Sequence, residues 1–243
     1  MEYACGVSFY VANRRRFVAA FALLPLLLLL TACPRPVSQP TQSLQKPLSI
    51  AADARRFRIL PAESQLILRV YREGRLARLG HNHVISTQQL AGDVYLAGDI
   101  LQSSAELRLA VNDLEVDRAD LRAQEGPDFS APVNPDAIAG TRSNMLGEQQ
   151  LNASVWPDII MRSRGVTGAY PMLALQVEIN IQGRLHTLVI PVQLQRDEKW
   201  LRASAEFSFR QTELGLVPFS VMLGALQVRD QIDARLLITA QAD

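Results

Sequence analysis

The chain has 243 residues, of which 48% are hydrophobic, and its 25 lysines and arginines nearly balance its 24 acidic residues. This composition excludes a disordered chain, which needs low hydrophobicity and a large net charge, and a collagen-like chain, which needs glycine at every third position. It also argues against nucleic-acid binding, because proteins of that class usually carry a clear basic excess.

Residues 1–32 have the parts of a secretion signal. Three arginines at positions 14–16 precede an apolar run from Phe17 to Leu30, and the small residues Thr31 and Ala32 follow. The run contains a proline and is shorter than the roughly 20 residues that a membrane-spanning helix needs. We therefore expect residues 1–32 to be a signal peptide that is removed from the mature protein.

The end of this segment, Leu30-Thr31-Ala32-Cys33, resembles the bacterial lipobox. The resemblance implies that Cys33 is lipidated and becomes the first residue of the mature chain, and attached acyl chains hold a protein firmly on a membrane. The alternative is ordinary cleavage near Ala32 without a lipid. Pro34 follows the cysteine in place of the aspartate that retains some lipoproteins at the inner membrane, so we expect a periplasmic, lipid-anchored protein, with the outer membrane favoured.

Residues 33–55 are rich in proline, glutamine, serine and threonine. Such a segment cannot bury enough apolar surface to order itself, and we expect it to be a flexible tether. No comparable change of composition occurs later in the chain. Residues 56–243 are therefore expected to form a single domain.

Alternation of apolar and polar residues dominates this domain and predicts half-buried strands. In Leu175–Ile181 every odd position is apolar and every even position is polar. An antiparallel sheet with one solvated face has to close or fold over to cover its other face and its edges. We therefore predict an all-β fold, a single closed antiparallel barrel of about eight strands, near residues 65–71, 93–97, 105–109, 159–163, 175–181, 187–194, 201–209 and 228–238.

Helical patterns are sparse, and we expect one to three short helices. Asp117 could cap a helix over residues 117–124, and residues 136–146 form a second candidate. The apolar residues between Phe219 and Leu226 recur at the spacing of a helix, behind Pro218 at its start.

The order of several segments resembles the YceI-like family over residues 57–239. The segments are Phe57–Ser64, Leu79–Ile85, Asn144 through Ile159, and Gly224–Asp230 before the last strand. Trp156 departs from the family, in which tyrosine or phenylalanine is commoner at this point. The resemblance implies a lipocalin-like barrel in the periplasm that binds a polyisoprenoid or a similar long-chain lipid.

An eight-stranded barrel can hold one small apolar ligand or fill its interior with side chains. Alanines 105, 203, 205 and 234 lie on the apolar face and leave room for a ligand, although neighbouring side chains could fill the same space. The alternative to a binding protein is therefore a structural envelope lipoprotein with a filled barrel. The candidates for lining the lumen are Leu68, Val70, Leu107, Leu109, Val177, Ile179, Phe207, Phe209, Leu236 and Ile238.

Two of the three histidines, His81 and His83, are separated by one residue, so on an extended strand their rings point to the same side. They could bind a metal ion with a third ligand such as His186 or Glu73, which leaves a metal-binding protein or metalloenzyme as a further alternative. The other interpretations are a hydrogen-bonded structural role at a barrel mouth, or contact with the polar head of a ligand.

The chain lacks the sequence motifs of a nucleophile elbow, a phosphate loop and a dinucleotide site. We therefore expect no catalytic activity and no cofactor beyond a bound isoprenoid or acyl lipid. The expected function is that of a periplasmic lipid-anchored protein that holds such a lipid inside its barrel.

Overall fold

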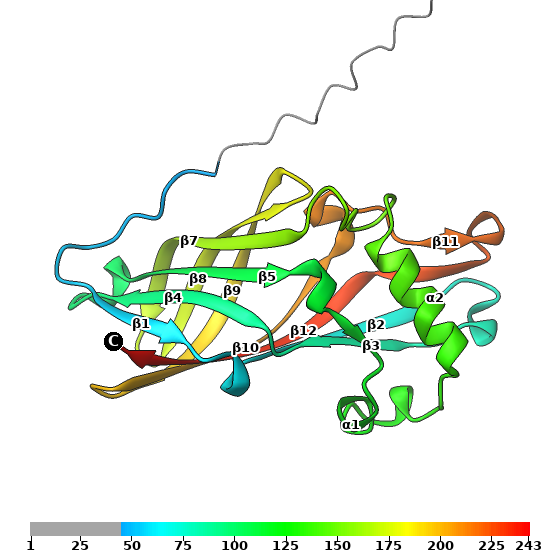
Figure 1. Cartoon of the computed structure of the whole chain (residues 1–243), viewed down its shortest axis with the longest axis horizontal. Helices are drawn as coiled ribbons and strands as arrows, with labels where there is room; N and C mark the ends of the chain where they lie inside the picture. Colours follow the sequence, from blue (N-terminus) through cyan, green and yellow to red (C-terminus); the bar gives the residue numbers. More distant parts are fainter. Residues whose placement is uncertain (1–44) are drawn as a thin grey trace, which may run out of the picture. The chain divides into compact units, whose positions relative to one another are not determined.

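Twelve strands and two short α-helices make up the part of the chain that the computed structural model describes, residues 45–243 (Figure 1). The strands are β1 (Arg55–Ile59), β2 (Gln65–Glu73), β3 (His83–Thr87), β4 (Leu90–Leu96), β5 (Ser104–Ala110), β6 (Glu115–Val116), β7 (Asp158–Ala169), β8 (Met172–Ile181), β9 (Arg184–Arg196), β10 (Trp200–Arg210), β11 (Ser220–Val221) and β12 (Leu226–Ala242). The helices are α1 (Ala119–Arg122) and α2 (Pro135–Leu146). Neither helix is long and apolar enough to cross a membrane.

Eight of the strands form a closed antiparallel barrel. Around the wall they follow the order β1, β4, β5, β7, β8, β9, β10, β12, and the pairing of β12 with β1 closes the ring. Closure leaves no edge strand in the ring, which is how an antiparallel sheet of this length avoids unpaired backbone groups. The all-β barrel of about eight strands that the alternating pattern predicts is confirmed.

Three further strands, β2, β3 and β6, extend the sheet at one end of the barrel. β2 follows β1 and pairs with β12, β3 precedes β4 and pairs with β2, and β6 follows β5 and pairs with β3. Between β1 and β2 the hydroxyl of buried Ser64 accepts a hydrogen bond from the Thr239 N–H at 3.0 Å, and the Leu60 N–H donates to the Thr239 carbonyl at 2.9 Å. These bonds pair the backbone N–H and carbonyl of Thr239 in β12 at the point where its neighbour changes from β1 to β2.

The ladder between β9 and β10 is short. Its register joins only Gln193–Arg196 to Leu201–Ser204, whereas both strands continue well beyond these residues. Leu194 donates its N–H to the Pro171 carbonyl on the β8 side, so the alternation of backbone groups places the nitrogen of Pro191 on the β10 side. Proline has no N–H, and the ladder ends where this donor is missing.

Helix α2 confirms the expected helix over residues 136–146. It begins at Pro135, and the Asn134 side chain caps it by accepting a hydrogen bond from the Ala137 N–H at 2.8 Å. The expected helix over residues 117–124 is reduced to α1, and its N-cap is Arg118. The prediction that Asp117 caps this helix is wrong, because the Asp117 carboxylate instead binds the side chains of His83 and Arg122.

The helix predicted over residues 219–226 is also wrong. Ser220 and Val221 form β11, which pairs with the start of β12, and a tight turn joins the two strands. Met222 and Leu223 in this turn have φ of 53° and 55°, a left-handed conformation that does not continue an α-helix. The apolar residues at helical spacing in this segment belong to a hairpin. The pairing of β11 with β12 therefore decides the local structure, and the spacing of apolar residues does not.

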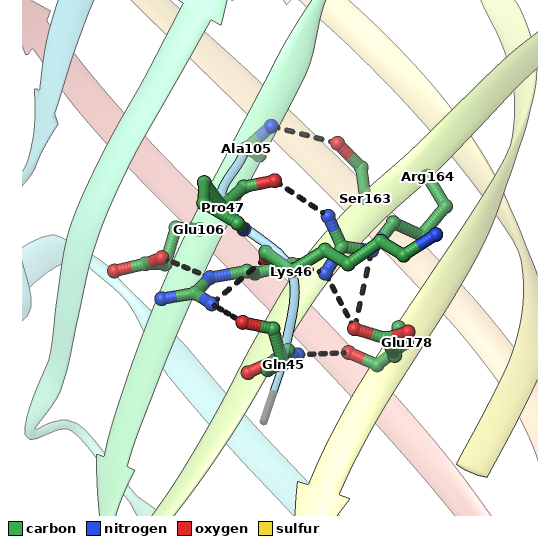
Figure 2. A network of polar contacts seen from close by, with 9 residues as sticks. Gln45, Lys46, Pro47, Ala105, Glu106, Ser163, Arg164 and Glu178 are labelled. Carbon is green, nitrogen blue, oxygen red and sulfur yellow. Dashed lines mark hydrogen bonds and ion pairs between the residues drawn. The ribbon is translucent and has the colours of Figure 1, made fainter. Parts of the chain in front are cut away.

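The described chain begins against the outer wall of the barrel. Arg164 donates hydrogen bonds to the carbonyls of Lys46 and Pro47 at 2.7 and 3.0 Å, and Gln45 donates to the Glu178 carbonyl at 3.2 Å (Figure 2). Glu178 also pairs with Arg164, which fixes the guanidinium in place. Residues 45–47 were expected to belong to the tether, and in the structure they contact β7 and β8. The earlier part of the tether lies outside the described residues.

Candidate ligand-binding site

The lumen of the barrel is apolar because the register of the strands aligns their apolar positions. On the β10–β12 ladder Ala205 faces Leu236, Ala203 faces Ile238 and Phe207 faces Ala234. Residues that lie directly opposite each other in an antiparallel ladder point to the same side of the sheet. The polar positions in between, such as Glu206 and Arg235, face outward.

Two adjoining cavities occupy this lumen. The large cavity has a volume of about 330 Å³ and lies toward the end of the barrel where β2, β3 and α2 are found. The small cavity has a volume of about 120 Å³ and lies toward the end where β4 and the last residues of β12 are found. Met161, Ile190 and Leu236 line both cavities and mark the place where they meet.

All ten residues that the sequence predicts as lining the lumen border these cavities. In the large cavity these are Leu68, Val70, Leu109, Ile179, Phe207 and Phe209. In the small cavity these are Leu107, Val177 and Ile238, and Leu236 borders both. The alternation of side chains along a strand is sufficient to place them, because it fixes which face each residue occupies.

The four alanines of the apolar face divide into two groups. Ala105 and Ala203 line the small cavity, so their short side chains do leave open space. Ala205 and Ala234 are buried and border neither of these two cavities. The lumen is therefore partly filled and partly hollow.

A polar group borders the large cavity beside β3. The imidazole Nδ1 of His83 lies 2.6 Å from Asp117 Oδ2, and His83 Nε2 lies 3.3 Å from the hydroxyl of Thr141 on α2. The Arg122 guanidinium donates to Asp117 Oδ1 at 2.7 Å, and the Val84 N–H donates to the same oxygen at 2.9 Å. His83 and Thr141 both line the cavity, while Asp117 and Arg122 stand behind them.

Asp117 is held as a carboxylate by this arrangement. Its side chain is only 1% exposed, and burial by itself would raise its pKa. The hydrogen bonds from His83 and the Val84 N–H, together with the charge of Arg122, outweigh burial and lower the pKa below its usual value. A buried carboxylate with three donors is an acceptor only, so His83 Nδ1 carries a hydrogen.

His81 also lines the large cavity, and the centroid of its ring lies 6.1 Å from that of His83. The two rings therefore reach the same cavity, as the spacing of the residues predicts. His186 lies elsewhere, against Gly215, where burial lowers its pKa. Within residues 45–243 no group of three histidine, cysteine or acidic side chains is close enough to hold a metal ion.

Asp117, Arg122 and Thr141 were missed by reasoning from sequence. Asp117 lies 34 positions after His83, Thr141 lies 58 positions after it, and Arg122 lies five positions after Asp117. No sequence motif joins them. Only the folded arrangement of β3, α1 and α2 brings them to one end of the cavity. Cys33, the predicted lipidation site, lies outside the described residues.

Comparison with solved structures identifies proteins with a similar fold. The structure is similar to that of BcnA from Burkholderia cenocepacia, with a TM-score of 0.55 and 11% sequence identity over 75% of this chain and 99% of that chain. A YceI protein from Campylobacter jejuni also matches, with a TM-score of 0.47 and 8% identity over 65% of this chain and 84% of that chain. No protein-family model matches the sequence, and no curated protein is similar to it. The likeness to BcnA agrees with the barrel described above, and it concerns the fold alone.

Proposed function

We propose that this chain is a YceI-like lipid-binding protein whose barrel holds one long-chain isoprenoid or acyl lipid. The observation that carries the proposal is the pair of adjoining apolar cavities, of about 330 and 120 Å³. The larger one falls in the range of small-molecule pockets, about 300–1,000 Å³. A flexible chain suits two adjoining cavities, because it can bend where they meet beside Met161 and Leu236.

Burial of apolar surface would supply the affinity. Each methylene taken out of water contributes about 0.8 kcal/mol, so a chain of a dozen buried carbons could bind without any charged partner. The lining residues give this environment, since leucine, isoleucine and phenylalanine predominate on the inward faces. We propose no catalytic step for the protein.

We also propose that the protein acts at the periplasmic side of a membrane, with the outer membrane favoured and with Cys33 carrying the lipid anchor. The support is the sequence Leu30-Thr31-Ala32-Cys33 at the end of an apolar leader. Labelling cells with a radioactive fatty acid would test it. A labelled wild type and an unlabelled Cys33→Ser variant are expected, and label retained by the variant would refute lipidation at Cys33.

Native mass spectrometry of protein purified from its own cells would test the binding proposal. We expect an added mass that organic extraction releases as a long-chain lipid. Leu236→Trp, which places a large side chain where the cavities meet, should abolish the added mass. Leu237→Trp is the matched control, because the same substitution one residue later points outward and should leave the lipid bound. Absence of bound lipid in wild-type protein, combined with failure to bind added isoprenoid alcohols, would refute the proposal.

A further inference from the structure

We propose that the polar end of the large cavity selects lipids with an uncharged hydroxyl head group, an alcohol or a phenol. The hydroxyl would donate a hydrogen bond to His83 Nε2 and accept one from the Thr141 hydroxyl. This inference rests on the proposed function, because it assumes that the tail of the lipid lies in the apolar lumen.

The orientation of His83 is fixed from behind. Its side chain is largely buried, and Nδ1 donates to Asp117 Oδ2 at 2.6 Å. In a neutral imidazole the second nitrogen then carries a lone pair and can only accept. In this neutral form Asp117 fixes the tautomer of His83, which then presents an acceptor, Nε2, on the other side of its ring.

Thr141 supplies the complementary donor. Its hydroxyl lies 3.3 Å from His83 Nε2, which is long for a hydrogen bond from a hydroxyl group. Both residues line the large cavity. A ligand hydroxyl beside them can accept from Thr141 and donate to His83 at normal distances, and it replaces one weak contact with two stronger ones.

The charges at this end of the cavity disfavour an anionic head group. Arg122 is 9% exposed and is committed to Asp117 at 2.7 Å and to the Ala131 carbonyl at 3.0 Å, so the two opposite charges balance. Arg72, the arginine that does line the cavity, is exposed and donates to the Gly80 carbonyl at 2.5 Å. A phosphate placed beside His83 would lose water and would approach the Asp117 carboxylate without a free buried cation.

The test compares three ligands with the same tail: geranylgeraniol, its methyl ether and its monophosphate. Dissociation constants would be measured at pH 8 by titration calorimetry on the delipidated full chain. We expect the alcohol to bind about five- to tenfold more tightly than the ether, the effect of one net hydrogen bond. The phosphate should bind more weakly than the alcohol.

His83→Asn isolates the role of Nε2. The amide nitrogen of asparagine can take the place of Nδ1 and donate to Asp117, while nothing replaces Nε2. We expect the preference for the alcohol to fall to twofold or less, with binding of the ether unchanged. His81→Asn is the matched control, since His81 lines the same cavity, and it should keep the full preference. Thr141→Val removes the complementary donor without changing shape. It should weaken binding of the alcohol and of the ether by a similar factor, because the oxygen of either ligand can accept from Thr141, and this test remains if His83→Asn fails to fold.

Equal binding of alcohol and ether by the wild type would refute this inference alone, because the tail would still occupy the lumen. Tighter binding of the phosphate, an undiminished preference in His83→Asn, or unchanged binding of the alcohol by Thr141→Val would refute it as well. Failure of all three ligands to bind would refute the proposed function and the head-group inference together.

Discussion

Replacement of Asp117 by alanine should destabilise the barrel far more than the loss of an ordinary ion pair. The Asp117 side chain is 1% exposed and accepts hydrogen bonds from His83, Val84 and Arg122 at 2.6, 2.9 and 2.7 Å. Alanine would leave the Arg122 guanidinium, itself 9% exposed, buried without its counter-ion. Removal of one partner of a buried pair costs about 3–5 kcal/mol, and we expect the free energy of unfolding to fall by this amount.

Urea unfolding followed by circular dichroism measures this difference, and Asp158→Ala is the control. Asp158 pairs with Arg108 at a similar distance, 2.8 Å, but the Arg108 side chain is 62% exposed. Such a surface pair contributes about 0–1 kcal/mol. Losses of similar size for the two variants, or a loss below about 1 kcal/mol for Asp117→Ala, would refute the view that the buried pair matters.

The loss of stability caused by Asp117→Ala should depend on pH. The pKa of Asp117 is lower in the folded chain than in the unfolded chain, where it is near 3.9. Its contribution is therefore fully present above the unfolded value and is lost as the pH falls through the lower folded value. The difference in stability between wild type and Asp117→Ala should be constant near neutral pH and should narrow below about pH 4. A difference that widens on acidification would contradict the direction of the shift.

Three further predictions address the lumen, the wall and the start of the described chain. In a series of linear alcohols, each added methylene should tighten binding by about 0.8 kcal/mol, roughly fourfold, until the cavities are full; affinity independent of chain length would argue against burial of the tail. Gly92→Ala should lower the free energy of unfolding by about 1–3 kcal/mol or more in urea titrations, because φ at this position is +137° and an added Cβ would overlap the Glu106 carbonyl. An unchanged midpoint of urea unfolding would contradict this reasoning. Arg164→Ala should increase the backbone mobility of Gln45, Lys46 and Leu48 in NMR relaxation measurements by releasing the carbonyls of Lys46 and Pro47, with little change in global stability, and unchanged mobility there would count against the contact.

The sequence was sufficient for the repeating part of the structure and insufficient for the polar end of the cavity. Alternation places Phe207, Phe209 and Leu236 on the inward face because the pleat of a strand leaves no other choice. The same reasoning failed at residues 219–226, where helical spacing of apolar residues occurs in a hairpin. The open volume could not be predicted, because it depends on how side chains from different strands fit together.

Asp117 illustrates the second limit. Its place before a short helical pattern suggests an N-cap, since local capping is the commonest use of such an aspartate. The structure instead pairs it with His83, 34 positions earlier in the chain. A contact between segments so far apart leaves no periodic trace in the sequence, and the histidines alone favoured a structural role while a metal site and a ligand contact stayed open.

The incomplete ladder between β9 and β10 makes the barrel mechanically uneven. Before Gln193 in β9 and after Ser204 in β10 the two strands share no backbone register, so separating them there breaks no ladder hydrogen bonds, whereas separating β8 from β9 would disrupt a ladder that runs from Met172 to Ile181. Thermal breathing of the wall is therefore expected along this seam. A single imino acid thus gives the barrel a compliant line beside a wall that is continuously paired.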